Sequence, residues 1–66
     1  MIIYANGKQI EIQEEISLAE FLRQNDYDAK RVAVEKNGNI VPRKNFDTEI
    51  LADGDKIEIV HFVGGG

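Results

Sequence analysis

The sequence predicts an α+β domain in which one main helix packs against one face of a mixed sheet of four to five strands. Three observations predict this fold class. Turn signals that contain glycine, at residues 6–7, 37–38 and 52–55, divide the chain into short elements. A capped, amphipathic stretch lies between two groups of β-branched segments. The last segment before the carboxyl end is the most apolar in the chain.

The chain opens with a predicted β-hairpin. Residues 2–5 are β-branched or aromatic, and the isoleucines of residues 8–12 alternate with polar residues. Asn6 and Gly7 stand between the two runs, and both tolerate the positive φ values of a two-residue type I′ turn. The sequence therefore predicts two antiparallel strands with one face toward water.

A helix is predicted to follow, with Ser17 at its N-cap. The Ser17 hydroxyl can accept the amide of Glu20, and the Glu20 carboxylate can reach back to the amide of Ser17. We expect the helix to end near Asn25, where a polar run replaces the apolar stripe. The residues of that stripe, which face a sheet, are Leu18, Phe21 and Leu22.

Four further segments complete the predicted fold. Residues 32–36 form a strand and residues 39–41 its short hairpin partner, which ends at Pro42. A single helical turn brings Phe46 into the core, and residues 50–51 return to the core as a very short strand.

The final strand covers residues 56–63. Because a helix connects the two halves, this strand can lie parallel to the first strand in the middle of the sheet. This is the ubiquitin-like β-grasp arrangement. We expect a β-grasp domain over residues 1–63 and a flexible glycine tail over residues 64–66.

Composition excludes several classes of function. The 66 residues include no cysteine and only one histidine, which removes disulfide scaffolds, thiolate metal sites and thiol catalysis. A net charge of −4 argues against nucleic acid as a ligand. The apolar run at residues 1–5 is too short for a signal peptide or membrane span. We expect a cytoplasmic domain with no metal and no membrane partner.

The carboxyl end carries three consecutive glycines, Gly64, Gly65 and Gly66. Glycine stabilises neither strand nor helix and loses the most backbone entropy when ordered. A frayed terminus or the remnant of an expression tag would explain them without function. A peptide without side chains can also thread a narrow channel and present its carboxylate beyond the globule. That carboxylate needs an outside enzyme to activate it as a mixed anhydride with AMP.

The last strand has two faces. If Ile57 and Ile59 face the helix, Val60 and Phe62 lie on the open side near the tail. We predict that Val60 and Phe62 form a docking surface for the adenylating partner. Burial of both side chains by a bulge or by an adjacent loop is the alternative.

Other polar residues carry no chemistry on this interpretation. His61 stands without a nucleophile in reach and is interpreted as a structural histidine rather than an acid–base group. The acidic pairs Glu14–Glu15 and Asp53–Asp55 lie at turns, where we expect them to be solvated rather than to bind a metal. No catalytic residue is predicted.

Three segments together resemble one family. They are the turn at residues 53–55 (DGD), residues 40–43 (IVPR) and the ending at residues 61–66 (HFVGGG). In these segments, in its length and in its element order, the chain resembles the thiamine-biosynthesis sulfur carrier proteins.

The resemblance implies a carrier that partner enzymes modify, and not an enzyme. An adenylating enzyme would use ATP and magnesium on the carboxylate of Gly66, and a sulfur donor such as a cysteine desulfurase would convert the adenylate to a thiocarboxylate. Thiazole synthase would then receive the sulfur. Gly64 and Gly65 would occupy the partner's channel. The resemblance implies no intrinsically bound cofactor, and we expect a monomer.

Two other functions share the glycine ending. A ubiquitin-like protein modifier would be conjugated through Gly66, and a molybdopterin-synthase-type carrier would pass sulfur to another pathway. A plain β-grasp binding module, with an incidental tail, is a third alternative. Removal of Gly65 and Gly66 would leave only the binding module unaffected.

Overall fold

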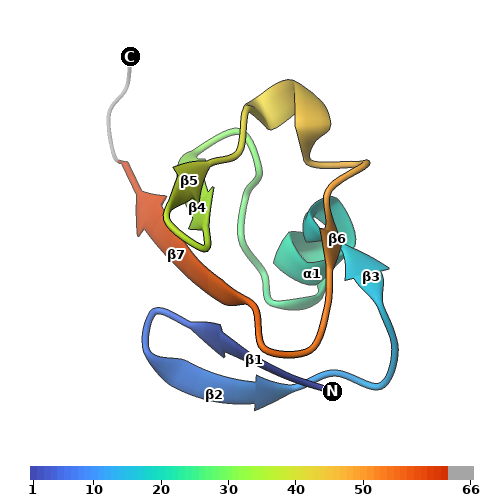
Figure 1. Ribbon diagram of the computed structural model, residues 1–66. Coiled ribbons are helices and arrows are strands. Elements are labelled where there is room, and N and C mark those ends of the chain that lie inside the picture. Colours follow the sequence, from blue (N-terminus) through green and yellow to red (C-terminus); the bar gives the residue numbers. More distant parts are fainter. Residues whose placement is uncertain (63–66) are drawn as a thin grey trace.

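The computed structural model describes residues 1–62. The predicted domain boundary after residue 63 lies outside this range. The elements, shown in Figure 1, are β1 (Ile2–Ala5), β2 (Lys8–Glu11), β3 (Ile16–Ser17), α1 (Leu18–Gln24), β4 (Val32–Lys36), β5 (Asn39–Ile40), the 3₁₀ turn η1 (Arg43–Asn45), β6 (Ile50–Leu51) and β7 (Lys56–His61).

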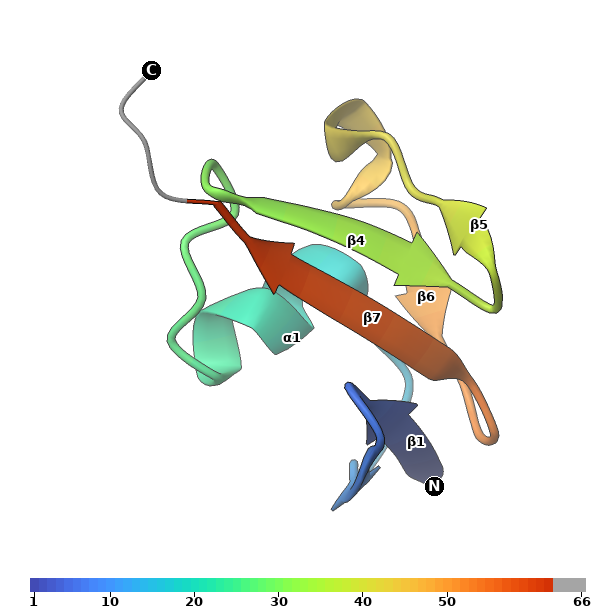
Figure 2. The same ribbon diagram turned by 90° about the vertical axis from the view of Figure 1, so that its left-hand side faces the viewer.

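Five strands form one mixed sheet in the order β2-β1-β7-β4-β5. β7 runs parallel to β1 on one side and antiparallel to β4 on the other. The ribbon in Figure 2 shows β7 crossing the middle of the sheet with α1 behind it. The central, parallel placement of the last strand confirms the β-grasp topology that the sequence predicts.

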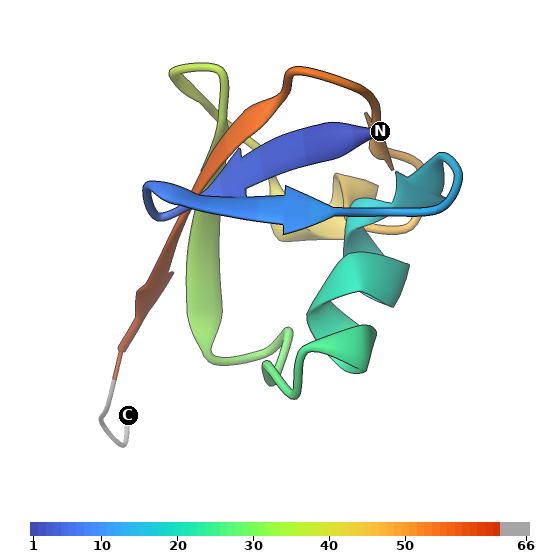
Figure 3. The same cartoon turned by 90° about the horizontal axis from the view of Figure 1, so that it is seen from below.

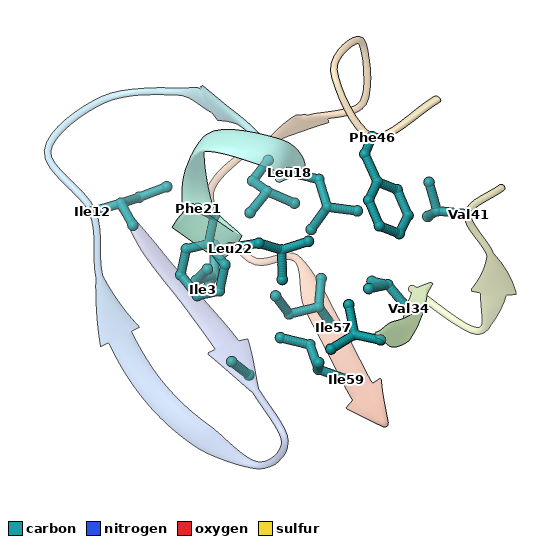
Figure 4. Close-up of a cluster of buried hydrophobic side chains, with 13 residues drawn as sticks. Ile3, Ile12, Leu18, Phe21, Leu22, Val34, Val41, Phe46, Ile57 and Ile59 are labelled. Carbon is teal, nitrogen blue, oxygen red and sulfur yellow. The ribbon is translucent and has the colours of Figure 1, made fainter. Parts of the chain in front are cut away.

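The core lies between α1 and one face of the sheet. Figure 3 shows the helix on one side of the strands only, and Figure 4 shows the apolar side chains that fill the space between them. Phe21 is 1% exposed and Phe46, at the end of η1, is 5% exposed, so both reach the core as predicted. The other buried apolar residues are Ile3, Ala5, Ile12, Leu18, Leu22, Val32, Val34, Val41, Leu51, Ile57 and Ile59.

The helix begins and ends as predicted, but its capping box is half formed. The Ser17 hydroxyl accepts the amide of Glu20 at 3.0 Å, and Asn25 is the C-cap. The Glu20 carboxylate instead accepts from the side chains of Arg23 and Gln24. Ser17 also belongs to β3, which pairs with β6.

One strand pairing and three strand ends differ from the prediction. The pairing of β3 with β6 forms a separate two-stranded sheet, which the sequence did not indicate because two residues are too few to show alternation. β2 ends at Glu11 and β5 at Ile40, one residue earlier than expected. β7 ends at His61, and residue 63 of the predicted strand lies outside the described residues.

Asp55 ties the turn before β7 to the rest of the sheet. Its carboxylate accepts hydrogen bonds from the amide of Ala52 at 2.8 Å and from Asn37 Nδ2 at 3.0 Å. Lys36 Nζ lies 3.7 Å from Asp55 Oδ2 and 2.7 Å from Glu49 Oε2. The Asp55 side chain is only 14% exposed, so the expectation of a merely solvated carboxylate is wrong.

These contacts set the ionisation of Asp55. Burial alone would raise the pKa of this carboxyl group. The hydrogen bonds from Ala52 and Asn37, together with the charge of Lys36, outweigh burial and lower the pKa below its ordinary value of 3.8. A carboxyl whose pKa is lower in the folded chain stabilises the fold above its unfolded-state pKa.

We therefore expect Asp55→Ala to lower the free energy of unfolding at pH 7 by about 2 kcal/mol, because a partly buried acceptor of two hydrogen bonds is lost. Urea denaturation measures the change. Asp47→Ala, at an exposed acidic position, is the control and should have little effect. The difference between Asp55→Ala and the parent should shrink as the pH falls below about 4. An unchanged difference at low pH would contradict the role of the carboxylate.

Candidate functional site

The candidate site is the open face of the sheet at the carboxyl end of β7. Side chains alternate along this strand, so that Ile57 and Ile59 are buried against the helix side. Val60 is 62% exposed and Phe62 is 48% exposed. The exposure predicted for these two residues is confirmed, and the alternative of burial by a bulge or loop is wrong.

Two residues that the sequence analysis did not select extend this apolar surface. Ala33 lies directly opposite Val60 in the β4–β7 ladder and is exposed. Ile40, on β5, is 75% exposed, and with Phe62 it lines one hollow of about 220 Å³. We call Ala33, Ile40, Val60 and Phe62 the tail-end patch. Alternation along the strand could have identified Ile40 in the sequence. Val41 is buried in the core, so the residue before it faces the opposite side of the sheet.

An acidic pair borders the tail-end patch. Glu35 and Glu58 are register partners on β4 and β7, and both are exposed on the open face. No ion pair joins either glutamate to a basic side chain within residues 1–62. Two like charges directly opposite each other destabilise an antiparallel pair. A basic group on a partner would relieve this repulsion, so the face favours a partner that is apolar at one point and cationic beside it.

His61 does not take part in a catalytic or metal-binding cluster in the described part of the chain. It occupies the last position of β7 and is exposed, although it shares a strand face with the buried Ile57 and Ile59. No group of three or more acidic or histidine side chains that could hold a metal ion occurs among residues 1–62. The predicted site residues Gly64, Gly65 and Gly66 lie outside the described residues.

Arg43 holds the chain that leads into β4. Its Nε donates to the carbonyl of Ala29 at 2.8 Å, and its second guanidinium nitrogen donates to the carbonyl of Val32 at 2.7 Å. The guanidinium carbon also lies 5.8 Å from the centre of the Phe46 ring. Arg43 lines the same hollow as Phe62, so it stabilises the wall beside the tail-end patch.

The fold and this surface define the class of protein. A central last strand, one covering helix and an apolar patch at the carboxyl end of that strand describe a ubiquitin-like β-grasp domain. The model of the ThiS family matches residues 3–66 of the chain. The chain belongs to the ThiS family.

Relatives of the whole length support this membership. The chain is 35% identical over 66 residues to the protein named "Sulfur carrier protein ThiS" of Bacillus subtilis, covering 98% of this chain and 100% of that one. The crystal structure of a thiamine biosynthesis protein (ThiS) from Geobacter metallireducens matches with a TM-score of 0.86 and 35% identity, covering 100% of both chains.

A longer relative places the same domain in another context. The chain is 36% identical over 66 residues to the protein named "Thiazole synthase" of Paramagnetospirillum magneticum, covering 100% of this chain. It spans only 20% of that relative's length. Among residues 1–62, no helix has the length and apolar character needed to span a bilayer.

We expect Arg43→Ala to lower the free energy of unfolding by about 1–2 kcal/mol, because two hydrogen bonds to backbone carbonyls are lost at a partly exposed position. Thermal and urea denaturation measure the loss. Lys44→Ala removes a neighbouring exposed charge for which no ion pair is found within residues 1–62, and it should leave stability nearly unchanged. Equal stability of the two variants would contradict the anchoring role of Arg43.

Proposed function

We propose that this protein carries sulfur for thiazole formation in thiamine biosynthesis, as a thiocarboxylate on Gly66. The observation that carries the proposal is the family match, which extends through the glycine ending to residue 66. The tail is thus part of what the chain shares with its family. On this proposal the protein is a cytoplasmic carrier that partner enzymes modify, and it performs no catalysis itself.

The carrier chemistry proceeds in two steps. The Gly66 carboxylate oxygen attacks the α-phosphorus of ATP and displaces magnesium-bound pyrophosphate, which forms an acyl adenylate. Sulfur at the oxidation level of sulfide, supplied by a donor such as a cysteine desulfurase with a thiol reductant, then attacks the acyl carbon and displaces AMP. The adenylating partner holds ATP and magnesium. No bound cofactor is required of this chain.

Thiazole synthase is the proposed acceptor of the sulfur. The support is the relative named thiazole synthase, one fifth of whose length is matched by this domain. Joining this domain to the rest of that relative in one polypeptide raises the effective concentration of each for the other. Such a fusion is favoured for domains that act together. Gly64 and Gly65 would give the reach and clearance needed to present Gly66 inside a partner's channel.

The tail-end patch is the proposed docking surface for the adenylating partner. Val60 lies on β7 and Phe62 directly after its end, so both are close in the sequence to the glycine ending. A partner that holds Gly66 therefore lies against this end of the sheet. Burial of the exposed apolar side chains stabilises the complex, and Glu35 and Glu58 favour a cationic group beside the apolar contact.

Intact mass spectrometry tests the carrier chemistry. With the cognate adenylating enzyme, ATP, magnesium and a sulfur donor, we expect the mass to increase by the difference between sulfur and oxygen. Because the chain has no cysteine, a thiol-selective alkylating reagent should label only the chain that carries the thiocarboxylate. A chain that lacks Gly65 and Gly66 is the control and should remain unlabelled. Conjugation to a lysine without any labelled species would instead indicate a protein modifier.

Phe62→Asp tests the docking surface. We expect a roughly tenfold or larger rise in the KM for adenylation, because a charge replaces an apolar contact in the patch. ATP–pyrophosphate exchange at varied carrier concentration measures KM. Tyr4→Asp is the matched control, since Tyr4 is also exposed, at 37%, but lies beside Lys56 at the opposite end of β7. Equal KM values for the two folded variants would contradict docking at Phe62.

A further inference from the structure

We propose that the free edge of β7 at His61 accepts an extended strand of the adenylating enzyme, as a short addition to the sheet. The inference rests on the proposed function, because it names a second contact of the enzyme that activates Gly66. This contact is made by the backbone of His61, and it is separate from the side chains of the tail-end patch.

Alternation of hydrogen bonds along β7 defines the edge. The amide of Phe62 donates to the carbonyl of Arg31 at 3.0 Å, so Phe62 points its backbone groups toward β4. The carbonyl of Ile57 accepts from the amide of Asn6 at 2.9 Å, so the odd-numbered residues point toward β1. The N–H and C=O of His61 therefore point to the β1 side.

β1 does not reach that far. Its register with β7 covers only Tyr4 with Lys56 and Ala5 with Ile57. The chain then turns at Asn6, whose φ is 51°. No segment within residues 1–62 pairs with the backbone of His61 on this side, and Figure 2 shows β7 extending past the end of β1.

The side chain of Asn6 replaces a strand partner where the β1–β7 pairing ends. Its Oδ1 accepts the amide of Ile59 at 2.7 Å and its Nδ2 donates to the carbonyl of Ile59 at 3.1 Å. One side chain thus satisfies both backbone groups of Ile59 where a strand would otherwise continue. The next backbone N–H and C=O that point to the β1 side belong to His61, an exposed residue, and they are open to a partner.

The length of the remaining chain limits which partner can occupy this edge. Four residues, 63–66, follow Phe62. Fully extended, they span at most about 14 Å at 3.3–3.6 Å per residue. An enzyme that holds the Gly66 carboxylate in its active site must therefore bring its surface close to His61. The edge at His61 therefore lies within reach of such an enzyme.

A hollow beside the edge favours an extended peptide. It has a volume of about 370 Å³, and Ala5, Asn6, Phe21 and Tyr27 are among the residues that line it. Asn6 therefore lies at both the hollow and the end of the β1 ladder. In strand addition, backbone hydrogen bonds supply affinity and pockets for alternate side chains supply specificity. Because polar side chains as well as apolar ones line this hollow, an amphipathic side chain of the incoming strand can enter it.

Amide hydrogen exchange tests the proposal on the unaltered protein. In the free protein we expect the amide of His61 to exchange rapidly, whereas the amide of Val60, which faces β4, is already protected. In the complex with the adenylating enzyme and ATP, we expect exchange at His61 to slow by roughly tenfold or more. Rapid exchange at His61 in the complex would overturn the proposal, as would protection by thiazole synthase alone.

Two variants separate the backbone from the side chain. His61→Pro removes the N–H at a position where β4 does not need it, and we expect a rise of about three- to tenfold in the KM for adenylation. His61→Ala keeps the N–H and should leave KM unchanged. Equal KM values for both variants would overturn the proposal, as would a parent dimer that His61→Pro dissociates. Failure of the parent chain to be adenylated at all would instead reject the proposed function.

Discussion

The parallel pairing of β1 with β7 sets the position of the last strand, around which the other elements pack. The amide of Tyr4 donates to the carbonyl of Asp55, and the amide of Asn6 donates to the carbonyl of Ile57, both at 2.9 Å. These bonds place the last strand in the centre of the sheet, between β1 and β4. β1 pairs only with the first part of β7, whereas β4 pairs with it as far as His61 and so fixes the position of the carboxyl end of the strand.

Central placement also divides the side chains of β7 between two environments. Ile57 and Ile59 complete the core beneath α1, so they are required for folding. Val60 and Phe62 project to the face that α1 leaves uncovered, where they contribute little to the core. One strand thus supplies both core side chains and part of the exposed apolar surface of the domain. Substitutions on the two faces should consequently affect different properties.

Strong local signals explain how much of this fold could be predicted from the sequence. Asn–Gly turns, a serine N-cap and period-two alternation each report on a few neighbouring residues, and all of these elements are present. The β3–β6 pair and the contacts of Asp55 depend on residues far apart in the chain, which local patterns do not encode. Likewise, Val60 and Phe62 could be assigned to the open face by alternation. Ala33 and Ile40 joined them only when the register of three strands was known.

The tail-end patch and the glycine ending are physically linked through conformational entropy. Ordering one residue's backbone costs about 1–2 kcal/mol, so ordering three glycines in a partner's channel costs roughly 3–6 kcal/mol. Glycine has no side chain with which to offset that cost. Burying the exposed parts of Ile40, Val60 and Phe62 contributes roughly 3–5 kcal/mol, on the scale of 1.5–3 kcal/mol for each fully buried side chain. The two quantities are comparable, so on the proposed function an apolar surface of about this size can offset the ordering of the glycines.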